Sequence, residues 1–220
     1  MGYLIHRAPV PPSLQAGFDS GDWKECGTIR VACFRPEGSG HQPETRFKLQ
    51  YDDRGLYGLF SVRDRFVRCV AERFQDMVCC DSCVEFFVRP AVGLGYINFE
   101  FNASGILLAQ HITDRRRRPG TDDARPLTEE EIAGIRIYHS LPDRVEPEIP
   151  EETRYEVGFF LPLELFEKIQ HAPIPVSGTV WRGNVYKCGD QTSHPHWASW
   201  RPVRRVNFHE PDCFDILEFE

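Results

Sequence analysis

The sequence lacks any apolar run close to the ~20 residues that a membrane-spanning helix needs. Residues 1–15 also lack the apolar stretch of a signal peptide. We therefore expect a cytoplasmic protein, or an exported one if a leader has been removed, without a membrane partner. A basic excess is missing too, because the formal net charge is −7. This charge disfavours a general nucleic-acid binder.

Signatures of nucleophilic catalysis are also missing. Ser199 lies between two tryptophans and has no flanking glycines, unlike the serine of a nucleophile elbow. Cys80 to Cys83 matches a C-x-x-C pattern, but it leads into a strand rather than a helix and has no second pair. A metal or thiol site stays open as an alternative, built from Cys79, Cys80, Cys83, Cys188 and His194.

Length and composition suit one sizeable domain. With 220 residues, 41% hydrophobic and 12% aromatic, the chain can build a large core without disulfides. We predict a single domain over 1–220, in which 1–25 forms an extended lead-in rich in proline and glycine. The eight cysteines are expected to be mostly free thiols, because no leader directs the chain to an oxidising compartment.

Short runs rich in aromatic and β-branched residues, separated by turn residues, predict an all-β protein. The pattern favours a β-sandwich of antiparallel sheets with one or two short helices. The expected strands span residues 29–34, 47–51, 56–62, 81–88, 96–102, 105–111, 135–139, 155–160, 178–188 and 213–219. Residues 162–169 read as a short helix with proline at its start, and 128–131 as a single helical turn. Residues 113–132 and 143–152 read as polar loops.

A row of polar side chains distinguishes one face of the predicted sheet. In 96–102, Asn98, Glu100 and Asn102 alternate with apolar residues, so they share a face. Glu85 belongs to the neighbouring strand. Such a row suits a polyhydroxylated ligand, since each sugar hydroxyl both donates and accepts hydrogen bonds. An ordinary solvated sheet face explains the same pattern and stays open.

Aromatic and basic residues near the end of the chain could complete such a surface. Trp197 and Trp200 have an odd spacing, so they cannot both face the core of one regular strand. One of them is therefore expected to face outward, where an indole can stack on a pyranose ring. Arg182 and Asn184 lie on one face of strand 178–188 and are candidates for hydrogen bonds to a ligand.

Two further alternatives follow from the acidic residues. Glu85 and Glu100 on neighbouring strands could act as the acid and base of a glycoside-processing hydrolase, provided that their separation suits the reaction. Asp52, Asp53 and Asp64 supply oxygens for a structural calcium ion, although no spaced loop motif accompanies them. We otherwise predict no cofactor.

Several motifs together resemble family 9 carbohydrate-binding modules. They are Tyr51-Asp52-Asp53 with Leu56-Tyr57, Asp81 to Phe87, Tyr96 to Asn102, Trp181 to Asp190, Ser199-Trp200 and Asn207 to Phe219. The resemblance covers most of the chain from about residue 47 and looks closest to stand-alone bacterial proteins of this type. It implies a jelly-roll-like β-sandwich that binds a saccharide without catalysis, and a glycoside hydrolase as a possible partner.

The resemblance also implies roles for individual residues. Family members hold a terminal sugar between two tryptophans, and Trp200 matches one of these. Glu85 matches the carboxylate that follows the Asp-Ser pair of the family, while Asn98 and Asn184 lie where polar side chains contact the ligand. The other clamp tryptophan is Cys79 here, and Glu100 stands where the modules carry a cationic contact. Because a thiol cannot stack like an indole, the ligand is expected to differ from that of the family 9 modules found on bacterial xylanases.

Overall fold

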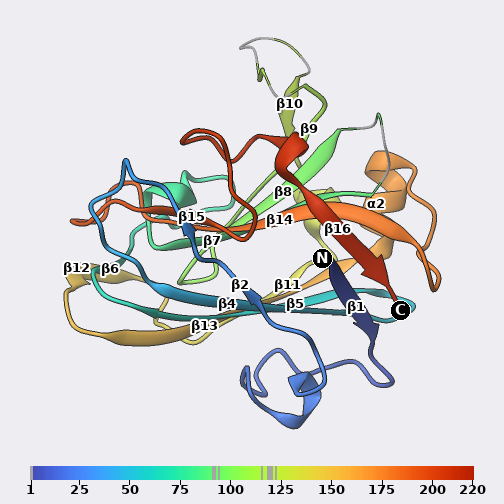
Figure 1. Ribbon diagram of the computed structural model, residues 1–220, viewed down its shortest axis with the longest axis horizontal. Coiled ribbons are helices and arrows are strands. Elements are labelled where there is room, and N and C mark those ends of the chain that lie inside the picture. The colour runs from blue at the N-terminus through green and yellow to red at the C-terminus, as the bar shows by residue number, and fades with distance from the viewer. Residues whose placement is uncertain (1, 91–92, 94, 115, 118–120, 122) are drawn as a thin grey trace.

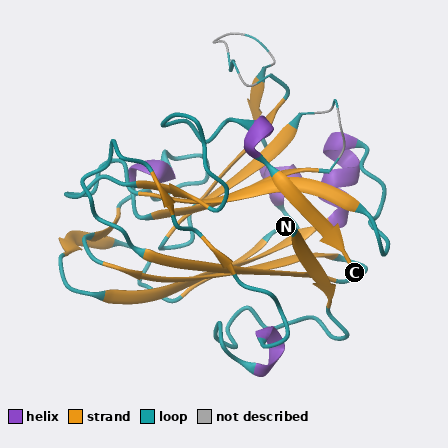
Figure 2. Ribbon diagram, viewed as in Figure 1, coloured by secondary structure: helices purple, strands orange, loops and turns teal. Residues whose placement is uncertain are grey.

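Two sheets pack face to face (Figure 1, Figure 2). Apolar residues alternate along their strands, so each sheet buries its apolar face against the other. The computed structural model describes residues 2–90, 93, 95–114, 116–117, 121 and 123–220. Arg115 and Arg118, from the predicted polar loop 113–132, lie outside this range. The β-sandwich predicted from the sequence is confirmed.

The first sheet carries the polar row of the sequence. In spatial order it contains β10 (Ala124–Pro126), β9 (Leu107–Ile112), β8 (Tyr96–Asn102), β7 (Cys83–Arg89), β14 (Val180–Cys188), β16 (Asp215–Phe219) and β1 (Tyr3–Arg7). Two short strands extend it beside the second half of β14, namely β15 (Trp197–Ser199) and β3 (Cys33–Phe34).

The second sheet carries none of the candidate saccharide-binding residues, and Asp64 of the calcium candidates ends one of its strands. It contains β4 (Glu44–Tyr51), β5 (Gly55–Asp64), β13 (Thr153–Pro162) and β11 (Arg136–His139), with β2 (Ile29–Arg30) beside β4. Beside the sandwich, β6 (Val67–Cys69) pairs with β12 (Val145–Ile149). Because β12 lies within 143–152, the prediction that this whole segment is a loop is wrong.

Strand β1 belongs to both sheets. Tyr3 to Ile5 pair with β16, and His6 and Arg7 pair with β4. Both pairings are parallel, so the sheets are not purely antiparallel as expected. The rest of the lead-in packs on the outer face of the second sheet, where Lys48 Nζ donates to the carbonyls of Phe18 (3.0 Å) and Trp23 (2.9 Å).

Two short α-helices occur among the described residues, α1 (Glu129–Ile132) and α2 (Leu163–Gln170). Helix α1 begins with a capping box, in which Thr128 and Glu131 each bond the backbone of the other. Three 3₁₀ turns accompany them, η1 (Gly21–Trp23), η2 (Val78–Cys80) and η3 (Pro211–Cys213). No helix among the described residues is long and apolar enough to cross a membrane.

The core between the sheets is aromatic. The Phe101 and Phe159 rings stack with centroids 5.2 Å apart, and Phe47 lies 4.4 Å from Phe60. Each fully buried phenylalanine contributes ~1.5–3 kcal/mol by leaving water. Since this core takes the inward residues of β7 and β8, the alternate residues of these strands must face outward, where they form the floor of a pocket.

Candidate functional site

Asp81 fixes the chain segment that enters the pocket. Its Oδ2 accepts hydrogen bonds from the backbone N–H groups of Val70 and Ala71 (both 2.9 Å) and from Asn102 Nδ2 (3.0 Å). The Asp81 side chain is buried, and Arg68 pairs with its Oδ1 at 3.1 Å. A buried carboxylate with this many donors holds its surroundings rigidly. Because Asp81 directly follows η2, it fixes this turn and thereby places Cys79 at the pocket.

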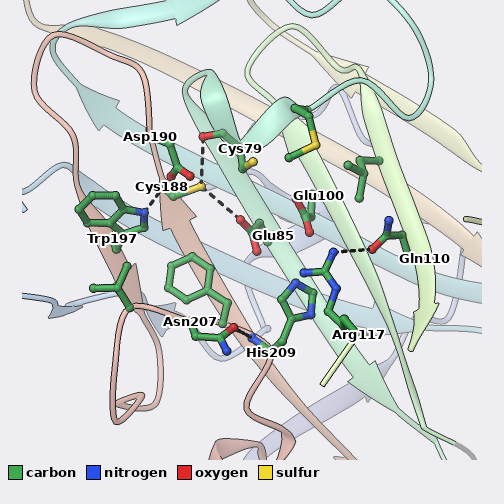
Figure 3. A pocket seen from close by; sticks show the side chains of 14 residues that line it. Cys79, Glu85, Glu100, Gln110, Arg117, Cys188, Asp190, Trp197, Asn207 and His209 are labelled. Carbon is green, nitrogen blue, oxygen red and sulfur yellow. Dashed lines mark hydrogen bonds between the residues drawn. The ribbon is translucent and has the colours of Figure 1, made fainter. Parts of the chain in front are cut away.

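The pocket lies on the outer face of the first sheet and has a volume of about 200 Å³. Glu85 and Glu100 form its floor, and they stand directly opposite each other on β7 and β8. Cys188 of β14 lies beside them, and its thiol donates to Glu85 Oε1 at 3.2 Å. Figure 3 shows both carboxyl groups turned towards the pocket.

One wall is aromatic and the other is polar (Figure 3). Trp197 lines the pocket from β15, and its Nε1 donates to Asp190 Oδ1 at 2.8 Å, which fixes the orientation of the indole. On the other side, Arg117 donates to Gln110 Oε1 at 3.2 Å. The remaining lining residues are Met77, Cys79, Leu108, Val206, Asn207, Phe208 and His209.

The floor carboxyls are almost completely buried, with Glu85 2% and Glu100 6% exposed. Burial raises the pKa of each above its ordinary range, and the neighbouring Glu100 raises that of Glu85 further. Burial also raises the pKa of Asp190. His209 is the reverse case, since burial lowers its pKa to about 3 and keeps the ring neutral.

The predicted site residues divide into two groups. Glu85, Glu100 and Trp197 line the pocket together. Asn98 lies behind Glu100, and its Nδ2 donates to Glu100 Oε1 at 2.7 Å. The Asn98 Oδ1 accepts from the backbone of Gln110 at 3.1 Å. Asn98 therefore orients the carboxyl group rather than lining the pocket itself.

The other three candidates lie elsewhere. Trp200 packs against the core between the sheets, and the Arg201 guanidinium lies 4.6 Å from the centroid of its ring. Asn184 is fully buried, and its Oδ1 accepts from the backbone N–H groups of Val185 and Arg201. Arg182 donates to the carbonyl of Phe214 at 3.2 Å. These contacts hold loops against the sheet.

The predicted metal and thiol cluster is partly assembled. The ligand atoms of Cys83, Glu85 and Cys188 all lie within 4.8 Å of one another, which suits a small metal ion. All eight cysteines are free. Burial raises the pKa of Cys83 to about 12, and contact with Cys83 together with burial raises that of Cys188. Both thiols are therefore protonated in the protein without a metal, and a metal that bound here would displace these protons.

His194 is not part of this cluster. Its ring stacks on Phe66, with the centroids 3.6 Å apart. His196 bonds instead to the buried Lys187 Nζ at 2.8 Å, and Lys187 pairs with Asp64 at 3.1 Å.

The candidates for calcium do not form one site. Asp52 precedes the ten-residue strand β5 and Asp64 ends it, so they lie at opposite ends of the sheet. Asp52 accepts from Tyr57 Oη at 2.9 Å, and Asp53 pairs with Arg7 at 2.7 Å.

Several pocket residues escaped the sequence analysis. Gln110 could have been found, because it shares the outward face of β9 and pairs with Asn98 across the strands. Asp190, Arg117 and His209 lie on loops, where periodicity gives no signal. Asp190 is held by a hydrogen bond from its backbone N–H to the carbonyl of Cys79 (2.9 Å), a long-range contact that spacing cannot predict.

A β-sandwich with a small, partly aromatic and partly acidic pocket on one sheet face has the architecture of a ligand-binding module. Its family is established by a family model, Carbohydrate-binding family 9, which matches residues 22–219. The chain belongs to this family, as the resemblance predicted.

Solved structures agree with the fold. A proposed carbohydrate-binding protein from Bacteroides uniformis ATCC 8492 is 27% identical, with a TM-score of 0.83 and 100% coverage of both chains. A family 9 module from Caldicellulosiruptor kristjanssonii in complex with glucose is 13% identical, with a TM-score of 0.66 over 99% of this chain and 95% of that one. The same organism's family 9 module in complex with cellotriose is 11% identical, with a TM-score of 0.66 over 99% of this chain and 93% of that one. No curated protein sequence matches.

Proposed function

We propose that the protein binds a saccharide, without catalysis, in the pocket between Trp197 and Gln110. The observation that carries this proposal is the placement of an oriented indole beside two buried carboxyl groups in one cavity. An aromatic face covers the apolar C–H groups of a sugar ring, and carboxyl and amide groups bond its hydroxyls. The family membership supports the same reading.

The size of the pocket supports a short ligand. Its volume of about 200 Å³ lies below the ~300 Å³ at which pockets for drug-sized ligands begin. We infer that one sugar unit enters, either as a monosaccharide or as the end of a chain. Trp197 stacks on this unit, Glu85 and Glu100 bond its hydroxyls from below, and Gln110 and Arg117 bond it from the side.

A hydrolase that uses Glu85 and Glu100 fits this arrangement less well. The two carboxyl groups of a glycosidase flank the bond that is broken, one on each side of it. Here both residues rise from the pocket floor at directly opposed positions of adjacent strands. This placement favours joint hydrogen bonding to one ligand over acid and base action from two sides.

Fluorescence provides a direct test. The chain has four tryptophans, of which Trp23 and Trp181 are buried and Trp200 packs against the core. A sugar that stacks on Trp197 should change the emission of this residue. We expect a saturable change with the bound saccharide that disappears in Trp197→Phe but persists in Trp200→Phe. A calorimetrically detected ligand that leaves the emission unchanged would contradict the proposed pose.

A further inference from the structure

The described part of the pocket carries more acidic than basic groups. Glu85, Glu100 and Asp190 line it, whereas Arg117 is the one described basic side chain in the lining, apart from the neutral His209. Arg117 is solvent-exposed and donates its hydrogen bond to Gln110 rather than to a floor carboxyl. Arg117 acts on Glu100 and Lys187 on Glu85 through their charge alone, and among the described residues neither donates a hydrogen bond to these carboxyls.

Both floor carboxyls keep an oxygen available for a ligand. Glu85 Oε1 accepts from the Cys188 thiol, and Glu100 Oε1 accepts from Asn98. Among the described residues, neither Oε2 has a hydrogen-bond partner, although both side chains are more than nine-tenths buried. Two such oxygens on directly opposed residues form a receptor for one group that donates several hydrogen bonds.

We propose that the saccharide is an amino sugar, whose ammonium group lies between Glu85 and Glu100. This inference rests on the proposed function and names its ligand class. An ammonium group has three donors, which suit the two Oε2 atoms and one further acceptor. It also favours the ionised form of the two buried carboxyl groups by offsetting their mutual repulsion. Hydrogen bonds between charged groups are about twice as strong as neutral ones.

A metal ion is a weaker candidate for the same charge. It would use Cys83, Glu85 and Cys188, so Glu100 and Asp190 would stay without a counter-charge. It would also find three ligand residues there, one fewer than a closed structural zinc site has. An ammonium group between the two floor carboxyls contacts both Glu85 and Glu100 and can belong to a ligand that lies beside Trp197.

The test is calorimetric titration at pH 7 in buffer containing a chelator. Each amino sugar is compared with its neutral parent: glucosamine and 6-amino-6-deoxyglucose with glucose, and galactosamine with galactose. We expect at least one amino sugar to bind about tenfold or more tightly than its parent, since bonds to charged groups exceed neutral ones by this order. N-acetylglucosamine, which lacks the positive charge, should show no such gain over glucose.

Variants then test whether the two floor carboxyls cause the tighter binding of the amino sugar. Glu100→Gln keeps the side-chain shape and removes the charge, so it should reduce the preference for the amino sugar to less than about threefold. Glu85→Gln gives an independent measurement if the first variant folds poorly by circular dichroism. Glu218→Gln, an exposed residue of β16 outside the pocket lining, is the matched control and should leave the preference unchanged.

The outcomes separate the two proposals. Binding of neutral sugars that is equal to or tighter than binding of every amino sugar overturns the inference and leaves the proposed function intact. A preference that persists unchanged in both Glu100→Gln and Glu85→Gln overturns it as well. A protein that binds no saccharide of either kind contradicts the proposed function itself.

Discussion

Separate replacement of Trp197 and Trp200 distinguishes a loss of saccharide affinity from a loss of unfolding free energy. Trp197 lines the pocket, held by Asp190, whereas Trp200 packs against the core between the sheets. If a sugar covers about half of the ~150–250 Å² that an aromatic side chain can bury, the contact contributes about 2 kcal/mol at ~25 cal/mol per Å². We therefore expect Trp197→Ala to weaken saccharide binding about 30-fold.

Trp200→Ala should have the opposite profile. Removing large aromatic side chains from a core costs ~3–5 kcal/mol, and because Trp200 is only partly buried we expect about 2–3 kcal/mol of lost unfolding free energy. Its affinity for the saccharide should change less than about threefold. The assays are calorimetric titration with the tightest ligand of the screen and urea unfolding. A folded Trp200→Ala protein that loses binding, with Trp197→Ala unaffected, would refute the assignment of the stacking residue.

Three further predictions concern buried charge. Asp64→Asn leaves the buried Lys187 without its negatively charged partner, so urea unfolding should show that ~3–5 kcal/mol of unfolding free energy is lost. A loss below about 1 kcal/mol would contradict a buried ion pair. Burial raises the pKa of Glu100 from 4.5 to about 7, so its contribution to stability is complete at acid pH and is lost as pH rises through this range. Wild type should therefore lose stability relative to Glu100→Gln between pH 4.5 and about 8, and parallel pH profiles would argue against the shift. Because Glu100 also raises the pKa of Glu85, the difference between the two proteins reports on the carboxyl pair. Because Cys83, Glu85 and Cys188 supply three ligand residues, one fewer than a closed structural zinc site, elemental analysis of dialysed protein should find less than one equivalent of zinc. A full equivalent that disappears in Cys188→Ser would show a metal site.

The strands could be predicted because their cause is local. Alternation in 96–102 places Asn98 and Glu100 on one face, and the sheet has them there. The turn chemistry of Asp52 to Gly55 predicts the hairpin of β4 and β5, which the structure confirms. In both cases the pattern and the turn lie within a few residues, so no distant partner is needed to fix the structure.

Local patterns could not predict strand β1 or which of Trp197 and Trp200 faces outward. Tyr3 to Arg7 read as part of a lead-in, because the strands that pair with them lie far along the chain at β16 and β4. The odd spacing of Trp197 and Trp200 predicts different environments, but it cannot tell which faces outward. That depends on the pairing of β15 with β14, which places Trp197 opposite Cys188 on the pocket face.

Long-range contacts also decide the role of Asp81. This residue begins one of the motifs that carry the family resemblance, yet its oxygens accept hydrogen bonds from Val70, Ala71, Asn102 and Arg68. Its contribution is to position η2 and thereby Cys79. A sequence pattern alone cannot separate a residue that contacts a ligand from one that holds the contacting segment.

The most direct test of the central claim is a calorimetric screen of the purified protein against mono- and oligosaccharides, with charged and neutral members. We predict that at least one saccharide binds with a Kd between micromolar and millimolar, and that Trp197→Ala weakens this binding about 30-fold. The absence of binding to every saccharide, by a protein shown to be folded, would contradict the claim that this pocket is a carbohydrate site.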